Sequence, residues 1–347
     1  MSVVTSEGLR SVLEVEAAIA AGESMFLAGS REMLSLLPRG NWIGGTITYF
    51  ITEDGGVFTK DLIYVTPVPF FALGADVMNY GPEDLSQLYR DAPANGFTYV
   101  VMPASTVVLQ TFAEQAPDYA GFLVRPVVGW VSGVPVERIG IDPPAVFNGK
   151  TGAVFEDQCV AMHVKLPDNK MADLDIVNIF DGGDGDVIRF DNAGFCATDC
   201  VIGGQPVNLA DYICLHAIKT EFPLIGDYNG SSINVSFLSV DPIARTVQMY
   251  APVFAGVDYR FAKPIGDYSG AFASMIASEN KPPDFACNCI LNYVYGKLEG
   301  KKTGNITGPV TFGEIAHQLL NQTMVRLYLR DVGQRRANIW PVPAEVK

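Results

Sequence analysis

Apolar and polar positions alternate with two different periods along this chain, one typical of helices and one typical of strands. Segment 6–21 follows helical spacing, and segment 30–37 predicts a second, shorter helix. Residues 41–51 are rich in β-branched and aromatic side chains, and the strand pattern returns at 57–66 after the turn Glu53-Asp-Gly-Gly56. These two strands predict a hairpin.

The remainder of the first half continues to mix the two periods. Helices are predicted at 82–90 and 105–115, and strands at 97–102, 124–131, 145–148 and 160–166. Segment 167–204 has an irregular pattern and is expected to be mostly loop. The sequence therefore predicts the α+β (mixed α/β) class, with mixed sheets flanked by helices.

The second half begins with a helix predicted at 209–220, which Asn208 can cap. Further elements are strands at 232–238 and 246–250, a helix at 267–279, and a helix or strand-to-helix corner at 312–320. We expect the boundary between two parts near residue 205, which gives parts of residues 1–205 and 206–347.

Charge and composition narrow the function classes. The chain of 347 residues carries 24 Lys and Arg against 38 Asp and Glu, a formal net charge of −14. Such a surface repels polyanions, so nucleic acid is excluded as a partner. No charge-free run of 18 apolar residues predicts a membrane span, and the N-terminus lacks a basic, then apolar, export signal. We expect a cytoplasmic protein without membrane contact.

Familiar catalytic and cofactor motifs are missing from the sequence. Gly149-Lys-Thr151 ends like a phosphate-binding loop, but Pro144 stands where the first glycine is needed. No dinucleotide-binding glycine fingerprint follows a strand, and the cysteine spacings are not those of zinc sites, so no metal is predicted.

The close pair Cys287 and Cys289 is the sharpest local feature of the sequence. On a strand, side chains two residues apart point to the same face, so these thiols could face a pocket. Three interpretations stay open: packing, the lining of a ligand pocket, and a nucleophile, which would need a lowered pKa. His163, His216 and His317 are the only histidines, so general bases are few.

Several segments together resemble the FIST family, a sensory domain with an N-terminal and a C-terminal half. Gly40-Asn-Trp-Ile-Gly-Gly-Thr-Ile-Thr-Tyr49 resembles a segment of the N-terminal half, and Arg125-Pro-Val-Val-Gly-Trp-Val-Ser-Gly133 resembles its end. Tyr250 to Tyr259, Phe285-Ala-Cys287 and Phe312-Gly-Glu-Ile-Ala316 resemble segments of the C-terminal half. Their order along the chain covers roughly residues 30–329.

This resemblance implies a two-part FIST-like domain that binds a small molecule between its halves. No output domain is attached, so a sensory role implies a protein partner that carries the signal, and a homo-oligomer is also open. Some members resemble haem-binding sensors, and a haem would need an axial His, Cys or Met, for which His317 and His163 are the candidates. The cofactor is otherwise unknown.

The predicted ligand site draws residues from both halves. Glycines allow the backbone to approach a ligand, aromatic rings supply apolar area, and Glu and Asn side chains orient it. The predicted ligand-binding residues are Trp42, Gly44, Gly45, Thr46, Gly129, Trp130, Cys287, Asn288, Cys289, Asn292, Glu314 and His317. Two alternatives remain: a cysteine-dependent enzyme that uses Cys287 or Cys289 with His317 as base, and a non-catalytic scaffold protein.

Overall fold

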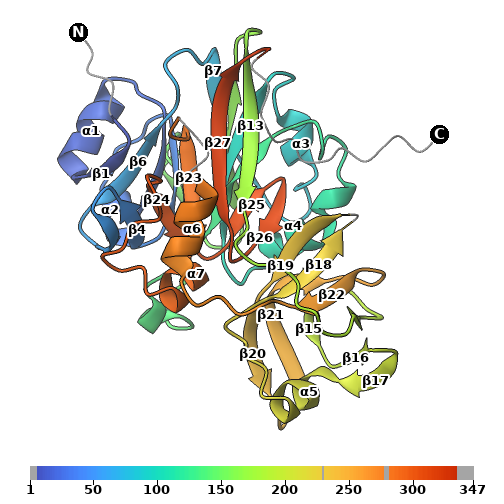
Figure 1. Ribbon diagram of the computed structural model, residues 1–347. Helices are drawn as coiled ribbons and strands as arrows, with labels where there is room; N and C mark the ends of the chain where they lie inside the picture. Colours follow the sequence, from blue (N-terminus) through green and yellow to red (C-terminus); the bar gives the residue numbers. More distant parts are fainter. Residues whose placement is uncertain (1–5, 229, 277–280, 334–347) are drawn as a thin grey trace.

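Three six-stranded sheets form the larger part of the protein in the computed structural model, which describes residues 6–228, 230–276 and 281–333 (Figure 1). The first sheet has the order β1 (Gly8–Arg10), β6 (Ile63–Pro67), β2 (Met25–Gly29), β3 (Trp42–Thr46), β10 (Val146–Asn148), β11 (Ala153–Phe155). The second has the order β26 (Gln318–Leu320), β25 (Glu314–Ala316), β9 (Val127–Ser132), β8 (Gly96–Pro103), β12 (Cys159–Lys165), β7 (Gly74–Tyr80). The third has the order β13 (Lys170–Val177), β27 (Met324–Asp331), β23 (Phe285–Cys289), β24 (Gly308–Thr311), β4 (Tyr49–Thr52), β5 (Gly55–Phe58).

One apolar core joins the inner faces of the three sheets. Phe26 of the first sheet stacks on Trp130 of the second and contacts Phe285 of the third, with ring centroids 5.6 and 5.5 Å apart. Helices cover the outer faces, where they form separate apolar clusters. These helices are α1 (Val12–Ala20) and α2 (Arg31–Ser35) on the first sheet, α3 (Gln87–Asp91) and α4 (Val107–Gln115) on the second, and α6 (Tyr268–Ile276) on the third. The α+β class is thereby confirmed.

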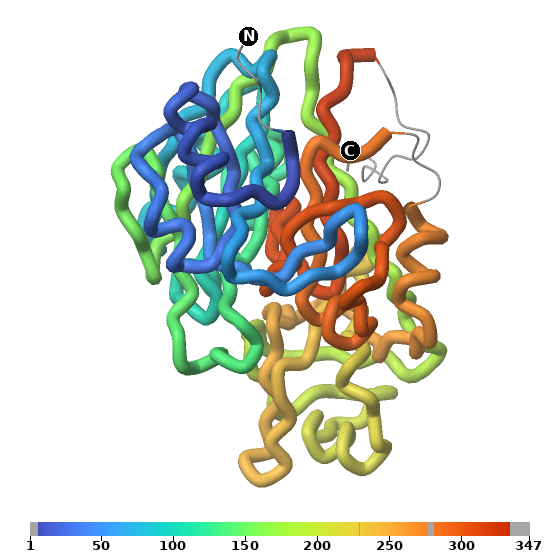
Figure 2. Tube along the Cα trace, turned by 90° about the vertical axis from the view of Figure 1, so that its left-hand side faces the viewer, coloured from blue at the N-terminus to red at the C-terminus, as the bar shows by residue number. Residues whose placement is uncertain are grey.

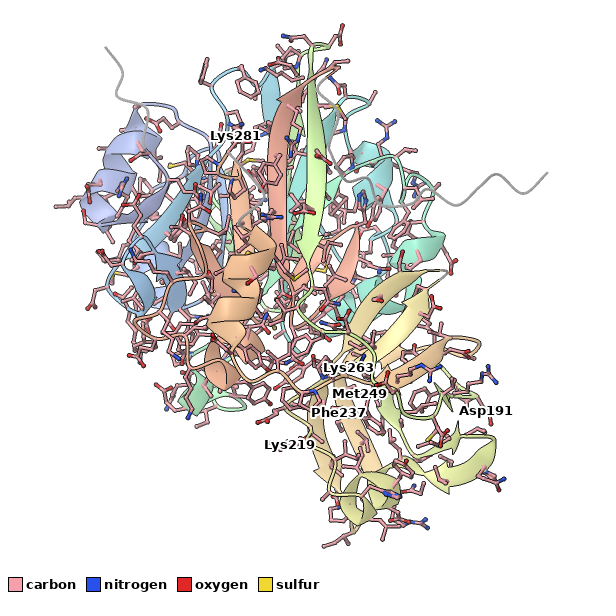
Figure 3. All side chains as sticks on the ribbon, in the orientation of Figure 1. Asp191, Lys219, Phe237, Met249, Lys263 and Lys281 are labelled. Atoms are coloured by element: carbon pink, nitrogen blue, oxygen red, sulfur yellow. The ribbon has the colours of Figure 1, made fainter. Side chains whose placement is uncertain are left out.

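A smaller unit of residues 188–261 projects from this body and has a core of its own (Figures 1 and 2). One of its sheets has the order β17 (Gln205–Asn208), β16 (Asp199–Ile202), β14 (Ile188–Arg189), β22 (Asp258–Phe261), β18 (Leu224–Tyr228), β19 (Ser231–Val235). The other has the order β15 (Gly194–Ala197), β21 (Thr246–Val253), β20 (Phe237–Asp241), and α5 (Leu209–Leu215) packs against both. Phe237 and Met249 face each other across β20 and β21 inside the unit, while Asp191 is exposed (Figure 3). The boundary predicted near residue 205 falls at the turn between β16 and β17, so this sheet includes strands from both predicted parts.

Two pairs of parallel strands determine where a ligand site can form. β2 pairs in parallel with β3, and β8 pairs in parallel with β9. The carboxyl ends of β3 and β9 meet, because the Gly133 N–H donates to the Thr46 carbonyl at 2.8 Å. The Ile47 N–H likewise donates to the Gly29 carbonyl at the end of β2, at 2.9 Å. Three strand ends from two sheets therefore lie together at one edge of the body.

Two predicted elements begin or pair differently from expectation. The helix predicted at 6–21 starts only at α1, because β1 precedes it and Ser11 forms a capping box with Glu14. The hairpin predicted over 41–66 is narrower: it consists of β4 and β5, with Thr52 opposite Gly55. β3 instead pairs with β2 and β10, since the chain crosses to another sheet after Thr46.

Two other predictions were wrong. Segment 167–204 contains the long strand β13, whose acids Asp173 and Asp175 pair with Arg330 and Arg326 of β27. The ion pairs satisfy side chains that made this strand look like a loop. Segment 312–320 forms the hairpin β25–β26, because Ile315 and Leu319, four residues apart as in a helix, face each other across it.

No helix among the described residues is long and apolar enough to span a membrane.

Candidate functional site

Eight of the twelve predicted site residues do come together, deep inside the body. They lie on β3, β9, β23, α7 (Ile290–Tyr295) and β25, and they are Gly45, Gly129, Trp130, Cys287, Asn288, Cys289, Asn292 and Glu314. Glu314 lies opposite Trp130 on adjacent strands, and the Cys287 thiol donates to the Gly129 carbonyl at 3.5 Å. The order of the motifs along the sequence thus predicted a real spatial neighbourhood.

A buried hydrogen-bond network occupies this neighbourhood. We call it the Glu314 cluster, and it consists of Asn288, Asn292, Thr311, Glu314 and Thr323, all buried. The Asn288 Oδ1 accepts from the Cys289 N–H at 2.8 Å and from the Asn292 Nδ2 at 3.0 Å. The Thr311 hydroxyl donates to the Asn288 carbonyl at 3.3 Å. These bonds hold β23, α7 and β24 together.

Glu314 is the ionisable member of the cluster. Its Oε2 accepts from the Thr323 N–H at 3.1 Å and from the Thr323 hydroxyl at 2.7 Å. Burial raises its pKa to about 8, although the hydrogen bonds from Thr323 oppose this rise. The carboxyl group is therefore mostly protonated at neutral pH, which avoids an uncompensated charge in the core.

The space beside the Glu314 cluster is too small for a metabolite. A cavity of about 10 Å³ is lined by residues that include Asn288 and Thr303. The Asn288 Nδ2 and the Thr303 hydroxyl are both buried without a hydrogen-bond partner in the described part of the chain. A volume of this size corresponds to one water molecule with polar neighbours. The polar atoms here fit a structural water, and a ligand between the halves does not fit at this position.

The alternative of a cysteine nucleophile finds no support in this geometry. Burial raises the pKa of the Cys287 and Cys289 thiols well above the usual value, and the nearby Glu314 adds to the rise. His317, at the turn between β25 and β26, packs against Phe122 on the opposite face of the hairpin from Glu314. The structure therefore does not bring His317 together with the cysteines.

The two histidines considered for haem are also engaged in other packing. The Nε2 of His163 is hydrogen-bonded to the Tyr80 hydroxyl at 2.7 Å, and its Nδ1 to the Thr98 hydroxyl at 2.8 Å. Burial lowers the pKa of His163 and of His317. No group of three or more metal-ligating side chains occurs among the residues that the structure describes. The residues present do not fit an axial haem ligand facing a cavity.

Trp42 and Gly44 point away from the neighbourhood of Glu314. The Trp42 indole packs on Phe147 in the cluster under α1 and donates to the Pro38 carbonyl at 2.9 Å. A Cβ at Gly44 would lie against Leu27 of β2. Both residues therefore belong to the packing between the first sheet and its helices.

A cavity of about 480 Å³ lies instead where the carboxyl ends of β2, β3 and β9 meet. We call it the strand-end pocket, and it is lined by Ser30, Arg31, Glu32, Thr46, Ile47, Thr48, Lys60, Gly133, Val134, Pro135, Arg138, Asp142 and Pro143. Of the predicted site residues, only Thr46 lines it. All of the lining residues lie within residues 30–143, inside the predicted N-terminal part.

Local hydrogen bonds shape the pocket walls. Ser30 caps α2 by accepting from the Met33 N–H at 3.3 Å, and its hydroxyl donates to the Lys60 carbonyl at 2.8 Å. The Thr46 hydroxyl accepts from the Ala145 N–H at 3.0 Å. The Thr48 hydroxyl is buried and has no hydrogen-bond partner among the described residues. Of these three hydroxyls, that of Thr48 is the one without any hydrogen-bond partner among the described residues.

Charged side chains gather at the pocket rim. The Arg138 guanidinium donates to both carboxylate oxygens of Asp142, at 2.7 and 2.6 Å, and Arg31 pairs with Glu156. These hydrogen bonds from Arg138 lower the pKa of Asp142, and the charges of Lys60 and Arg31 contribute. Lys60 lies over the Phe58 ring, 5.6 Å from its centroid.

A sequence signal for this pocket existed but was not used. Thr46 ends a strand, and Ser30, Ile47 and Gly133 each follow directly on a strand end, where ligands gather in parallel sheets. The position of the Lys60 turn and of the segment 135–143 beside these ends depends on tertiary packing. Those residues could not be assigned from spacing alone.

Comparison with known proteins gives a family but no activity. A protein-family model described as a family of unknown function (DUF6976) matches residues 10–330. No curated protein is similar to the chain by sequence. The resemblance to FIST proteins stays a prediction.

Proposed function

The chain belongs to the DUF6976 family, whose function is unknown, and from this premise we propose that the protein is a small-molecule-binding module whose ligand occupies the strand-end pocket. The observation that carries the proposal is the position of the pocket at the carboxyl ends of β2, β3 and β9. Ligands of open parallel sheets bind at this edge, because the loops there are free to vary while the strands hold them in place.

Size and lining support a metabolite-sized ligand. A volume of about 480 Å³ falls within the range of roughly 300–1,000 Å³ that is usual for such sites. Ile47, Val134 and Pro135 supply apolar surface, and the buried Thr48 hydroxyl lacks a hydrogen-bond partner in the described chain. A buried hydroxyl without a partner destabilises the folded state by about 1–3 kcal/mol unless a ligand or a water satisfies it.

A sensory role also requires that binding alter a surface that a protein partner can contact. Segment 135–143 suits this requirement, since it carries the pocket residues Arg138 and Asp142 and also exposes the apolar side chains of Ile139 and Ile141. A ligand that shifts the backbone of this segment would reposition these side chains. Signal output through such a partner belongs to the same proposal.

The test is a thermal-shift screen of neutral, anionic and cationic metabolites on three proteins: the wild type, Thr48→Val and Ser132→Ala. Ser132 is a matched control, because its hydroxyl is also buried and without a partner in the described chain, yet it does not line the pocket. A ligand at a hundred times its Kd adds about 2.7 kcal/mol to the free energy of unfolding.

We expect at least one compound to stabilise the wild type and Ser132→Ala alike, and to stabilise Thr48→Val less. Native mass spectrometry of the hit complex then gives the mass of the ligand and its stoichiometry. A screen without hits, or hits that act equally on all three proteins, would contradict the proposal.

A further inference from the structure

The strand-end pocket does not share the acidic excess of the whole chain. Its lining carries the cations Arg31, Lys60 and Arg138 against the acids Glu32 and Asp142. The chain as a whole has a formal net charge of −14. Arg31 is paired with Glu156 and Arg138 with Asp142, which leaves Lys60 as the cation of the lining without an ion pair among the described residues. Such a cation at a pocket can attract an anion locally, although the long-range field of the chain repels anions.

Asp142 already behaves as an anion bound among these cations. Arg138 holds both of its carboxylate oxygens, and the charges of Lys60 and Arg31 also act on it. The side chains of Arg138 and Asp142 are 43% and 44% exposed, so their ion pair is weak and can exchange at little cost. The Arg31–Glu156 pair is exposed to a similar degree. An incoming anion could therefore take the place of either acid.

Neutral hydrogen-bond donors complete the site for an oxygen-bearing anion. Thr48 lines the pocket, and its buried hydroxyl has no hydrogen-bond partner among the described residues, so a small rotation of this side chain would offer a donor to a ligand oxygen. Lys60 has an ammonium group with three donors, and it forms no ion pair among the described residues. A cationic ligand would be repelled by Lys60, and a neutral one would leave this ammonium group without a partner.

We propose that the strand-end pocket binds a small oxyanion, a carboxylate or a phosphate ester, with Lys60 as its main charge partner and Asp142 as the group that it displaces from Arg138. This inference rests on the proposed function and adds the charge class of the ligand. Charge-assisted hydrogen bonds from the ammonium and guanidinium groups would supply both affinity and selection against neutral analogues.

The test is a set of calorimetric titrations at constant ionic strength with four probes. Succinate and inorganic phosphate represent the two oxyanions, and they show which one the pocket prefers. Succinamide is the neutral counterpart of succinate, and 1,4-diaminobutane is a cation. The variants are Lys60→Met, Asp142→Asn and the control Lys165→Met. Lys165 is a suitable control because it pairs with Gly96 at the start of β8, at the end of the second sheet opposite the pocket.

We expect at least one oxyanion to bind the wild type, to bind Lys60→Met about tenfold more weakly, and to bind Lys165→Met unchanged. Asp142→Asn should bind the same oxyanion more tightly, because its competing carboxylate is gone. Absent oxyanion binding, or equal affinity in Lys60→Met, overturns this inference.

The two proposals fail separately. If succinamide or the diamine binds and the oxyanions do not, the charge class is wrong and the ligand-binding function stands. If no probe binds, the charge class is overturned, and the ligand-binding function falls with it only when the metabolite screen also gives no hit on the wild type, or only hits that act equally on Thr48→Val.

Discussion

The Glu314 cluster and the strand-end pocket are both polar, both formed by several strands, and both close to glycine-rich sequence. They differ in how their polar groups are satisfied. In the cluster, buried side chains mostly bond to one another, and the adjoining cavity is about 10 Å³. In the pocket, half-exposed ion pairs and one unpartnered hydroxyl line about 480 Å³.

This difference shows why a group of polar residues is not in itself a binding site. A buried network whose side chains bond mainly to one another stabilises one arrangement of strands, so a substitution there lowers the free energy of unfolding. An open site keeps groups that lower stability or contribute little to it, so a substitution there mainly changes the affinity for the ligand. The following predictions test this separation, from the largest expected effect to the smallest.

Thiol accessibility should differ most between the two regions. Cys287 and Cys289 are buried, Cys196 and Cys214 are exposed, and a Lys60→Cys variant places a thiol in the pocket. Because a buried thiol reacts only after the core opens, Cys287 and Cys289 should react with iodoacetamide more than about a thousandfold more slowly than the other three. Peptide mass spectrometry over time gives each rate. Rapid labelling of Cys287 or Cys289 would contradict the closed cluster and restore the cysteine-enzyme alternative.

Removal of a carboxyl group should cost far more in the cluster than at the pocket rim. Glu314→Ala removes the acceptor of two hydrogen bonds from Thr323 and opens a cavity, so the free energy of unfolding should fall by about 3 kcal/mol. Glu156→Ala removes the exposed partner of Arg31 and should change the free energy of unfolding by about 0.5 kcal/mol or less. Urea denaturation measures both. Equal losses would show that burial does not separate the two regions.

A methyl group added at the β3–β9 contact should strain the wall between the regions. A Cβ at Gly45 would lie 2.5 Å from the Val101 side chain and 2.8 Å from the Trp130 ring, so Gly45→Ala should destabilise the protein by about 2 kcal/mol. Gly74→Ala is the control within a strand, since nothing lies near its Cβ. If both variants unfold at the same urea concentration, the tight packing at Gly45 is wrong.

Glu314 should also make stability depend on pH. Its pKa is raised from 4.5 in the unfolded chain to about 8 in the folded one, so between these values the folded state holds a proton that the unfolded state has lost. The stabilisation from this proton is full below pH 4.5 and declines as pH rises, by at most about 1.4 kcal/mol per pH unit, until about pH 8.

The measurement for this prediction is the difference in unfolding free energy between the wild type and Glu314→Gln across a pH series. Other groups with shifted pKa values, such as Glu7 and His163, are present in both proteins and cancel. The unfolding free energy of the wild type should fall relative to that of Glu314→Gln as the pH rises. A difference that is constant from pH 5 to pH 8 would place an ionised carboxylate in the cluster.

The smallest effect should have opposite signs in the two regions. Thr48→Val removes a hydroxyl that has no partner among the described residues, so it should leave the free energy of unfolding unchanged or raise it by up to about 1 kcal/mol. Thr323→Val removes a hydroxyl that donates to Glu314 and should lower it by about 1–2 kcal/mol. A loss at Thr48 similar to that at Thr323 would mean that the Thr48 hydroxyl is structural.

Much of the fold could be predicted from local patterns, because apolar period and turn residues mark strands such as β8 and helices such as α4 directly. β13 was missed because its acids pair with arginines of β27, at the far end of the sequence. The hairpin β25–β26 was missed because a spacing of four residues fits either a helix or a two-residue alternation.

The candidate site was predicted less well than the fold. The motif residues around Glu314 were correctly expected to meet, since sheet order brings β9, β23 and β25 together. Their burial could not be predicted from the sequence, and burial decides against a ligand there. The pocket depends on loops from four separate segments, and Lys60 and Arg138 reach it only through tertiary packing.

The most direct test uses threonine methyl groups as reporters in both regions at once. Thr46 and Thr48 line the pocket, while Thr303, Thr311 and Thr323 lie in or beside the Glu314 cluster. Protein labelled with ¹³C at threonine methyls is titrated with succinate, with inorganic phosphate and with a small-molecule cell extract. We predict shifts at Thr46 and Thr48 that saturate, with the other three unmoved. Saturating shifts confined to Thr303, Thr311 and Thr323, or none at Thr46 and Thr48 with any addition, would contradict a ligand site at the strand ends.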